Sequence, residues 1–533
     1  MTEEEKEIEL MELEKEGSII SAYTQIPYFL LDDEVTSSIK QEYQNDYNEI
    51  AKFYSIYKLG NSFTTEGSNG HYLPSRLRYK KSAMIINKEA RFLFSNPPSF
   101  NINPQDVDSE YTEENAIIQD YLNMVLDKTD FNGKLLKALK DCFIGKRIAI
   151  VCNFNEESGI TVTFLNSLEF IYETSGERDN ELTKFVMFYK IVDVSSLTDQ
   201  RWFKKKYVKK DGKVYLTESI YSGDGKLIES ISDDEEILFP YIPATVVLND
   251  GLTSEWKGES ELGHIVDYEK AYSKLSNSDI DSLRKNMHAV KYTIDASQDS
   301  SSKFSTSPGS YWDIQSDEES SIERQAKVGT LETEMKYSEP LNTTLGRIEN
   351  EMYNEVDVPN ITSEQLAGVI TSGKTIQALY WGLTVRCDEK MLAWGYSLRF
   401  IAQTIIEGGK LYPNCISRYT DAKKIPDIPY IILVENNYPI PEDIKEEKEL
   451  DIAEVEALVM SKKSYLKKWK KLSDKDADEE LKQIKVEQEL LENSVMRYIG
   501  NNNELQDKTD VVSESDDDFN VENKEVENKE EVE

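Results

Sequence analysis

The fold is decided by residues 259–287, which read ESELGHIVDYEKAYSKLSNSDIDSLRKNM. Apolar residues recur in this stretch mostly at helical intervals, so the pattern predicts one long amphipathic helix. A second helix is predicted over Tyr337–Val356, where apolar residues form a narrow seam. Between the two, Ala289–Gly329 has short strand-like runs around a Ser-rich segment and reads as a small β-containing insertion. Two helices that bracket such an insertion are expected to run antiparallel, like a stalk with a tip.

On the N-terminal side of this stalk, the chain reads first as helices and then as strands. Helical spacing of apolar residues continues through Tyr111–Phe143, and β-branched and aromatic runs follow from Arg147 onward. Asp211-Gly212 and Asp224-Gly225 suit tight hairpin turns, so they predict an antiparallel meander. The runs predicted as strands here are 147–154, 160–165, 185–192, 202–209, 214–221 and 227–231.

On the C-terminal side, Ser372–Glu407 predicts a third long helix, in which Gly382 and Gly395 are candidate bends. An apolar run at 430–434 is predicted as a strand, and the highly charged segment 444–492 is predicted as helical. The fold class is therefore α+β. The last residues, 500–533, are acidic and almost devoid of large apolar side chains, which predicts disorder.

The charge of the chain restricts its partners. Its 533 residues exceed what one hydrophobic core usually organises, so more than one structural region is expected. Lys and Arg total 62 against 100 Asp and Glu, which gives a formal charge of −38. That sign disfavours static, high-affinity DNA binding, because proteins hold phosphates with cationic side chains. It is compatible with DNA as cargo, since an acidic channel wall repels the backbone and lets a duplex slide.

Patterns typical of catalysis and metal binding are absent from the sequence. The four cysteines are scattered without CxxC pairing, which indicates neither a disulfide framework nor a zinc knuckle and favours a reducing compartment. None of the three histidines belongs to an HExxH motif. No apolar run approaches the roughly 18 residues that span a bilayer, and the Glu-rich start lacks the pattern of a signal peptide. We therefore predict no catalytic residue, no cofactor, no metal site and no membrane segment.

One motif does point to an enzyme. Gly368–Thr375 reads GVITSGKT and matches GxxxxGK followed by Ser or Thr, the pattern of loops that cradle phosphates. A working loop of that kind follows a buried strand, whereas residues 358–367 are typical of a loop or a helix start. The preferred interpretation is that Thr371 or Ser372 caps the following helix. A P-loop ATPase that uses Gly368–Thr375 is kept as the alternative.

Several short motifs also stand in a characteristic order along roughly Ala83–Glu492. They are LNSLEFIYE at 165–173, IPATVVLND at 242–250, GESEL at 258–262, HIVD at 264–267, Ala271-Tyr272, Ser276, Pro359-Asn360, Ser372-Gly373-Lys374, the helix around Trp394 and the segment 461–480. Each motif is short, and it is their order and spacing that resembles the portal proteins of tailed bacteriophages, of the siphophage type.

The resemblance implies a subunit of a ring, typically of twelve copies, around a central channel. The implied regions are an N-terminal wing at 1–258, a first stem helix at 259–288, a clip at 289–330, a second stem helix at 331–356, a tunnel loop at 357–371, a long bent helix and wing return at 372–438, a crown at 439–499 and the acidic tail at 500–533. A filament or scaffold built from helical stalks is a further interpretation of the same long helices.

The resemblance also implies roles for particular residues. The candidate channel residues of the tunnel loop are Val358, Asn360, Thr362, Glu364 and Gln365. The acidic candidates for the channel lumen are Glu351, Glu355 and Asp357, which would help DNA to slide.

The implied partners are further copies of the chain, double-stranded DNA passing without sequence preference, the terminase, the major capsid protein, the scaffolding protein and a head–tail adaptor. The implied location is the portal vertex of the virion, after assembly in the host cytoplasm. The implied protein is not an enzyme, because the terminase supplies the energy for packaging.

Overall fold

The structure is a computed structural model, in which the described residues are 30, 37–60, 74–105, 111–156, 159–175, 181–191, 201–252, 255–287, 290–294, 327–331, 336–361, 373–416, 424–439, 444–470 and 477–487. The chain forms two compact units, Met1–Pro441 and Glu442–Glu533. Long helices and antiparallel strands both occur in the first unit, so the prediction of a mixed α+β chain is confirmed.

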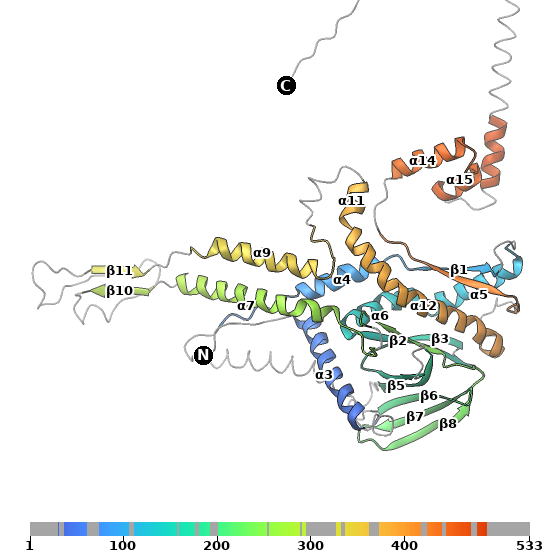
Figure 1. The fold of residues 1–533 in the computed structure, drawn as a ribbon, viewed down its shortest axis with the longest axis horizontal. Coiled ribbons are helices and arrows are strands. Elements are labelled where there is room, and N and C mark those ends of the chain that lie inside the picture. The colour runs from blue at the N-terminus through green and yellow to red at the C-terminus, as the bar shows by residue number, and fades with distance from the viewer. Residues whose placement is uncertain are drawn as a thin grey trace, which may run out of the picture. The chain divides into compact units, whose positions relative to one another are not determined.

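The helices of the first unit are α3 (Ser37–Leu59), α4 (Lys81–Phe94), α5 (Glu113–Lys128), α6 (Phe131–Gly145), α7 (Glu261–Met287), α9 (Ser338–Asn354), α11 (Gly373–Leu379), α12 (Trp381–Leu411) and α13 (Pro413–Ile416). Its strands are β1 (Ser99–Pro104), β2 (Arg147–Asn155), β3 (Gly159–Asn166), β4 (Phe170–Thr174), β5 (Leu182–Ile191), β6 (Arg201–Lys210), β7 (Lys213–Ser222), β8 (Leu227–Glu236), β9 (Ala244–Leu248), β10 (Val290–Ile294), β11 (Lys327–Leu331) and β12 (Tyr430–Glu435). Figure 1 shows their arrangement.

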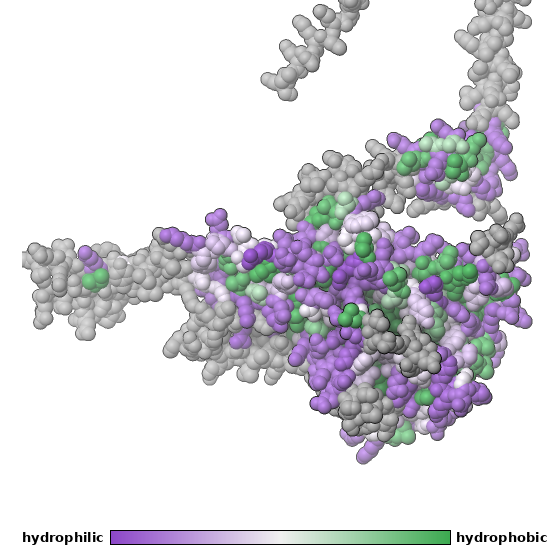
Figure 2. All heavy atoms as spheres, in the orientation of Figure 1, coloured by the Kyte–Doolittle hydropathy of each residue, from purple (hydrophilic) through white to green (hydrophobic). Residues whose placement is uncertain are grey.

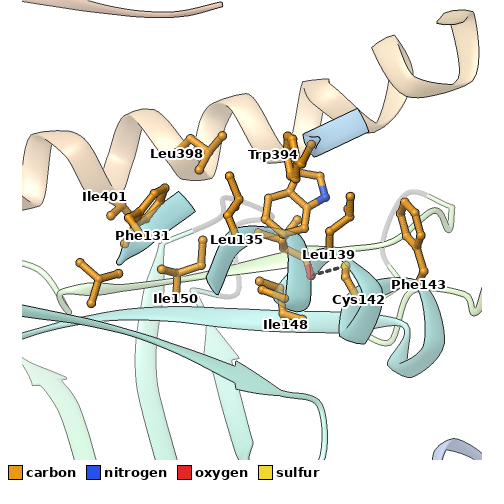
Figure 3. Packing of buried hydrophobic residues seen from close by; sticks show 14 of the residues in the cluster. Phe131, Leu135, Leu139, Cys142, Phe143, Ile148, Ile150, Trp394, Leu398 and Ile401 are labelled. Carbon is orange, nitrogen blue, oxygen red and sulfur yellow. Dashed lines mark hydrogen bonds between the residues drawn. The ribbon is translucent and has the colours of Figure 1, made fainter. Parts of the chain in front are cut away.

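A three-stranded sheet, in the order β3-β2-β9, lies between helices on one face and a second sheet on the other. Along β2, Ile148 and Ile150 pack with side chains of α6 and α12, whereas Ala149 and Val151 pack with side chains of the second sheet. This alternation follows from the two-residue period of a strand. Figure 3 shows the helical side of this core, where Trp394 of α12 lies over α6 and β2.

The second sheet is antiparallel, in the order β4-β5-β6-β7-β8, and it contains the predicted meander. Asp211 and Gly212, with φ of 52° and 78°, form the turn between β6 and β7, which is the left-handed pair that a tight hairpin needs. The edge strand β8 continues to Glu236, five residues beyond the predicted end at Ile231. Its second half is acidic and exposed, and its pairing with β7 explains why so polar a segment is a strand.

The predicted long helix at 372–407 is divided into α11 and α12, and the division falls at Tyr380. The division falls two residues before Gly382, and α12 continues through Gly382 and Gly395, so the bends at these two glycines stay predictions. Packing of the buried Trp394 next to Gly395 holds the helix against the core, and such packing outweighs the low helix propensity of glycine. A Cβ added at Gly382 would lie 3.6 Å from the Cβ of Asp357, which is an ordinary van der Waals contact.

The predicted stalk is present as α7 and α9, which lie side by side, and the antiparallel β10–β11 ribbon stands at their far end (Figure 1). The way α7 packs differs from the prediction, because Leu283 near its end is exposed. The buried side of α7 carries instead a row of polar residues four apart, which are Glu269, Ser273, Asn277 and Asp281. Glu269, Asn277 and Asp281 accept hydrogen bonds from the backbone N–H groups of Lys81, Leu77 and Ser75 at 2.9, 2.9 and 2.8 Å. The segment before α4 is therefore fixed along the stalk by polar contacts.

Strands β1 and β12 pair antiparallel although more than 300 residues separate them, with Ser99 opposite Glu435 and Pro104 opposite Tyr430. The second compact unit contains α14 (Ile444–Glu456), α15 (Lys462–Lys470) and a helical stretch at 477–487. Its basic helix pairs with neighbouring acids, as in the Lys468–Asp451 ion pair at 2.9 Å. The tail at 500–533, predicted to be disordered, lies outside the described residues.

Candidate functional site

The three acids predicted for a channel lumen lie together at the C-terminal end of α9. Glu351, Glu355 and Asp357 are all exposed, and Met352 and Val356 on the inner side of the same turns are fully buried. Four residues make just over one helical turn, so Glu351 and Glu355 share one side of the helix. The result is a patch of three carboxylates beside the base of the stalk.

Asp357 has a definite structural role at this helix end. Its φ is 50°, in the left-handed region, and its N–H donates to the carbonyl of Asn354 at 3.1 Å. The N–H of Val358 donates to the carbonyl of Tyr353 at 3.0 Å. This pair of bonds is the Schellman motif, in which glycine normally takes the left-handed position. An aspartate there tolerates the conformation and also places a carboxylate at the surface.

Glu355 is held in place by the neighbouring helix. The hydroxyl of Tyr268 on α7 donates to its carboxylate at 2.9 Å, and this bond raises the pKa of Tyr268. Six residues earlier in α9, Glu349 pairs with Lys81 of α4 at 2.6 Å. These two contacts connect the C-terminal part of α9 to α7 and to α4, so the helix that carries the acidic patch is held on two sides.

The structure describes only two of the candidate channel residues after α9, and the two differ in burial. The side chain of Val358 is buried in the main core of the single chain. Its burial has a physical reason, because the residue after the left-handed position of a Schellman motif commonly makes an apolar contact with the helix. Asn360 is half-buried and donates to the side-chain oxygen of Asn350 at 3.0 Å. Thr362, Glu364 and Gln365 lie outside the described residues.

The phosphate-loop motif is only partly described. Residues 368–372 lie outside the described residues, and Gly373 begins α11. The described segment before the motif, 355–361, is turn and irregular chain and contains no strand. A phosphate loop needs a strand directly before it that aims its backbone N–H groups, and the residues at that place, 362–367, lie outside the described residues.

A buried charge cluster that the sequence analysis did not predict lies where α4, α7 and α12 meet. Glu261, the first residue of α7, and Glu89 of α4 are both fully buried. Arg386 donates to Glu261 at 2.6 Å and to Glu89 at 3.3 Å, and Lys390 donates to Glu261. Asp250, which is exposed, lies 3.2 Å from Lys390 at the edge of the cluster. The cluster thus holds three carboxylates against two cations.

Because the cluster has one more carboxylate than it has cations, one of its carboxylates is expected to hold a proton. Burial and the nearby charge of Glu261 raise the pKa of Glu89, and one oxygen of Glu89, Oε2, has no hydrogen-bond partner. Burial alone would raise the pKa of Glu261, but Lys390 and Arg386 lower it below its ordinary value. A protonated Glu89 leaves two carboxylates facing two cations. The spacing of Arg386 and Lys390, four apart on a predicted helix, is the one sequence signal for this cluster, and it is also typical of a solvated helix face.

The described residues contain no group of three or more His, Cys, Asp or Glu side chains arranged to hold a metal ion. The four cysteines are buried and unpaired, and burial raises the pKa of the Cys142 and Cys152 thiols far above the ordinary value. Within the part of the chain that the structure describes, no helix has the length and apolar character needed to cross a membrane.

A family model described as phage portal protein, SPP1 Gp6-like, matches residues 36–493. No curated protein matches the chain. The matched range includes the stalk, both sheets, the acidic patch and the buried charge cluster.

Proposed function

The chain belongs to the phage portal protein family, and from this premise we propose that it is one subunit of a closed ring at a capsid vertex, with a channel through which viral DNA is packaged and ejected. The family match over residues 36–493 is the observation that carries this proposal. The match supports a role in the head-to-tail connection of a bacteriophage.

The acidic patch suits a channel wall. Glu351, Glu355 and Asp357 present three carboxylates that repel a phosphate backbone, and the formal charge of −38 is unsuited to holding DNA tightly. A wall of this kind would let a duplex pass without binding at any one position. In the proposed ring, residues 357–371 form the tunnel loop that follows the patch.

The stalk suits a docking role. We assign α7 and α9 to the stem, residues 289–330 with the β10–β11 ribbon to the clip, residues 1–258 and 372–438 to the wing, and 439–499 to the crown. A ribbon at the end of a long helix pair is well separated from the core of its own chain. It supports docking of the terminase during filling and of a head–tail adaptor afterwards, with the scaffolding and major capsid proteins as further partners of the ring.

The chain is proposed to have no enzymatic activity, with the terminase as the source of energy. The rival, an ATPase that uses Lys374 and Thr375, lacks a strand in the described segment before its motif. Purified protein is expected not to hydrolyse ATP, and replacing Lys374 by Ala is expected to leave assembly unchanged.

The test of the proposal is the mass and shape of the purified protein. Mass photometry is expected to give a single species of roughly 700 kDa, about twelve times the 61.3 kDa chain, and negative-stain electron microscopy is expected to show rings with a central hole. A stable monomer at physiological salt, or an open filament without a discrete mass, would refute the ring.

A further inference from the structure

Helix α12 has apolar side chains on two sides, and only one side is covered by its own chain. The inward side contributes Trp394 to the core. On the outward side, Trp381 is 70% exposed and Leu392 is 77% exposed. Val385, which lies between them in the sequence, and Tyr396, which follows Leu392, are exposed as well. Their spacing of four, seven and four residues places all four on one side of the helix. Figure 2 shows hydrophobic side chains on the face of the molecule where α11 and α12 lie.

This apolar stripe leads into a groove. Farther along α12, Arg399, Gln403 and Leu411 line an open groove of about 710 Å³ together with Leu238 and Ile431. The Arg399 guanidinium donates to the carbonyl of Gly395 at 3.2 Å and, among the described residues, has no carboxylate partner. The outward side of α12 is thus apolar in its first half and basic at Arg399. We call this surface, from Trp381 to Gln403, the α12 stripe.

A surface of complementary character exists on β8. This strand forms the edge of the five-stranded sheet, and in its first half Leu227, Ile228 and Ile231 are all at least half exposed. Its second half is the exposed acidic run Asp233–Glu236. An exposed edge with apolar side chains is a surface that soluble proteins usually cover or blunt with charge. The β8 edge therefore has an apolar half and a charged half, like the α12 stripe, but with the opposite charge.

The apolar halves of the two surfaces lie in different layers of the first unit. α12 packs on β2 and β9 of the three-stranded sheet, the five-stranded sheet packs on the other face of that sheet, and β8 is its outer edge. Figure 1 shows α12 and β8 on either side of this stack. The charged ends come closer together, because Leu238 and Pro240, just after β8, line the same groove as Arg399 and Gln403.

We propose that the α12 stripe of one copy binds the β8 edge of the next copy, so that the subunits of the ring join head to tail. This inference rests on the proposed function, because it names the surfaces that close the proposed ring. An interface between two different patches generates a ring when its rotation closes. The apolar halves bury one another, and Arg399 of one copy faces the acidic half of β8, with Asp233 as its partner.

Two variants test the two surfaces separately. Leu392→Glu places a charge in the stripe, and Ile231→Glu places one in the β8 edge. Both positions are exposed in the single chain, so neither change disturbs its core. Each variant is expected to lose at least tenfold of its ring fraction in mass photometry and to collect at the monomer mass. Leu252→Glu, at a residue 76% exposed but on neither surface, is the matched control and is expected to form rings.

Mixing the two variants distinguishes the loss of a head-to-tail contact from misfolding of the variant chains. The Ile231→Glu copy keeps an intact stripe and the Leu392→Glu copy keeps an intact edge, so the mixture is expected to form dimers of twice 61.3 kDa and nothing larger. Restored assembly of the Arg399→Glu, Asp233→Arg double variant, with each single variant impaired, would identify the charge pair.

The outcomes separate the two proposals. If the wild-type chain forms no ring, the proposed function fails. If the wild-type chain forms rings and Leu392→Glu does so equally well, the proposed function stands and the α12 stripe is not the interface. Monomeric variants that fail to form dimers on mixing would show that the stripe and the edge do not bind one another.

Discussion

Replacing Glu89 by Gln is expected to remove part of the pH dependence of stability between about pH 4.5 and 8. Glu89 is fully buried, and burial with the neighbouring charge of Glu261 raises its pKa from 4.5 to about 8. In the unfolded chain the same carboxyl releases its proton near pH 4.5. Between these values the folded state holds one proton more than the unfolded state, so stability falls as the pH rises through this window.

The size of the effect follows from the shift. One pKa unit corresponds to about 1.4 kcal/mol, so a shift of this size costs up to roughly 5 kcal/mol by pH 8. Gln is neutral at every pH and has nearly the same shape, so the variant lacks this cost. Glu89→Gln is therefore expected to be less stable than or equal to the wild type near pH 5 and more stable near pH 8.

The assay is thermal unfolding of the full-length chain by differential scanning fluorimetry from pH 5 to 9. Glu114→Gln, at an exposed residue of α5, is the matched control, and its melting curve is expected to follow the wild type at every pH. Parallel pH profiles for Glu89→Gln and the wild type would refute the reasoning, because they would mean that Glu89 does not carry the extra proton of the cluster.

Three further substitutions test other parts of the fold by the same assay. Glu261→Gln removes the carboxylate that accepts from both Arg386 and Lys390, and breaking such a buried pair is expected to cost about 3 kcal/mol at pH 7; a loss below 1 kcal/mol would contradict the assigned contacts. Asp357→Gly relieves a left-handed residue and is expected to raise stability by about 0.5–1 kcal/mol, whereas an unchanged melting temperature would argue against the Schellman motif. Gly408→Ala places a methyl group against the Phe154 ring and is expected to cost about 1–3 kcal/mol, with no loss if the ring can move aside.

The sequence predicted those elements whose apolar residues follow the local period. The stalk helices, the long helix of α12 and most strands of the meander were found because their buried side chains repeat at helical or alternating intervals. The polar row on α7 was missed for the same reason. Glu269, Ser273, Asn277 and Asp281 recur every fourth residue, which is also the pattern of a solvated face. Only the chain segment before α4 turns that face into a buried one.

A local sequence pattern cannot indicate which strands pair when they are far apart in the chain. The partner of β12 is β1, more than 300 residues away, and the acidic end of β8 is a strand only because β7 lies beside it. At the candidate site, the exposed positions of Glu351 and Glu355 agree with helical periodicity. The burial of Val358 does not follow from periodicity, since it depends on the left-handed turn at Asp357.

The net negative charge of the chain opposes association between its copies. Each copy carries a formal charge of −38, so copies repel one another at low salt, and the contact between them must come from burial of apolar surface. The basic side chains Arg386 and Lys390 in the middle of α12 are engaged inside the chain, which leaves the α12 stripe mainly apolar. The Debye length falls from about 30 Å at 0.01 M salt to about 8 Å at 0.15 M, so salt screens the general repulsion. Ring assembly is therefore expected to increase from 0.01 M to 0.15 M NaCl in mass photometry. A ring fraction that falls steadily over this range would mean that ion pairs, rather than apolar burial, hold the copies together.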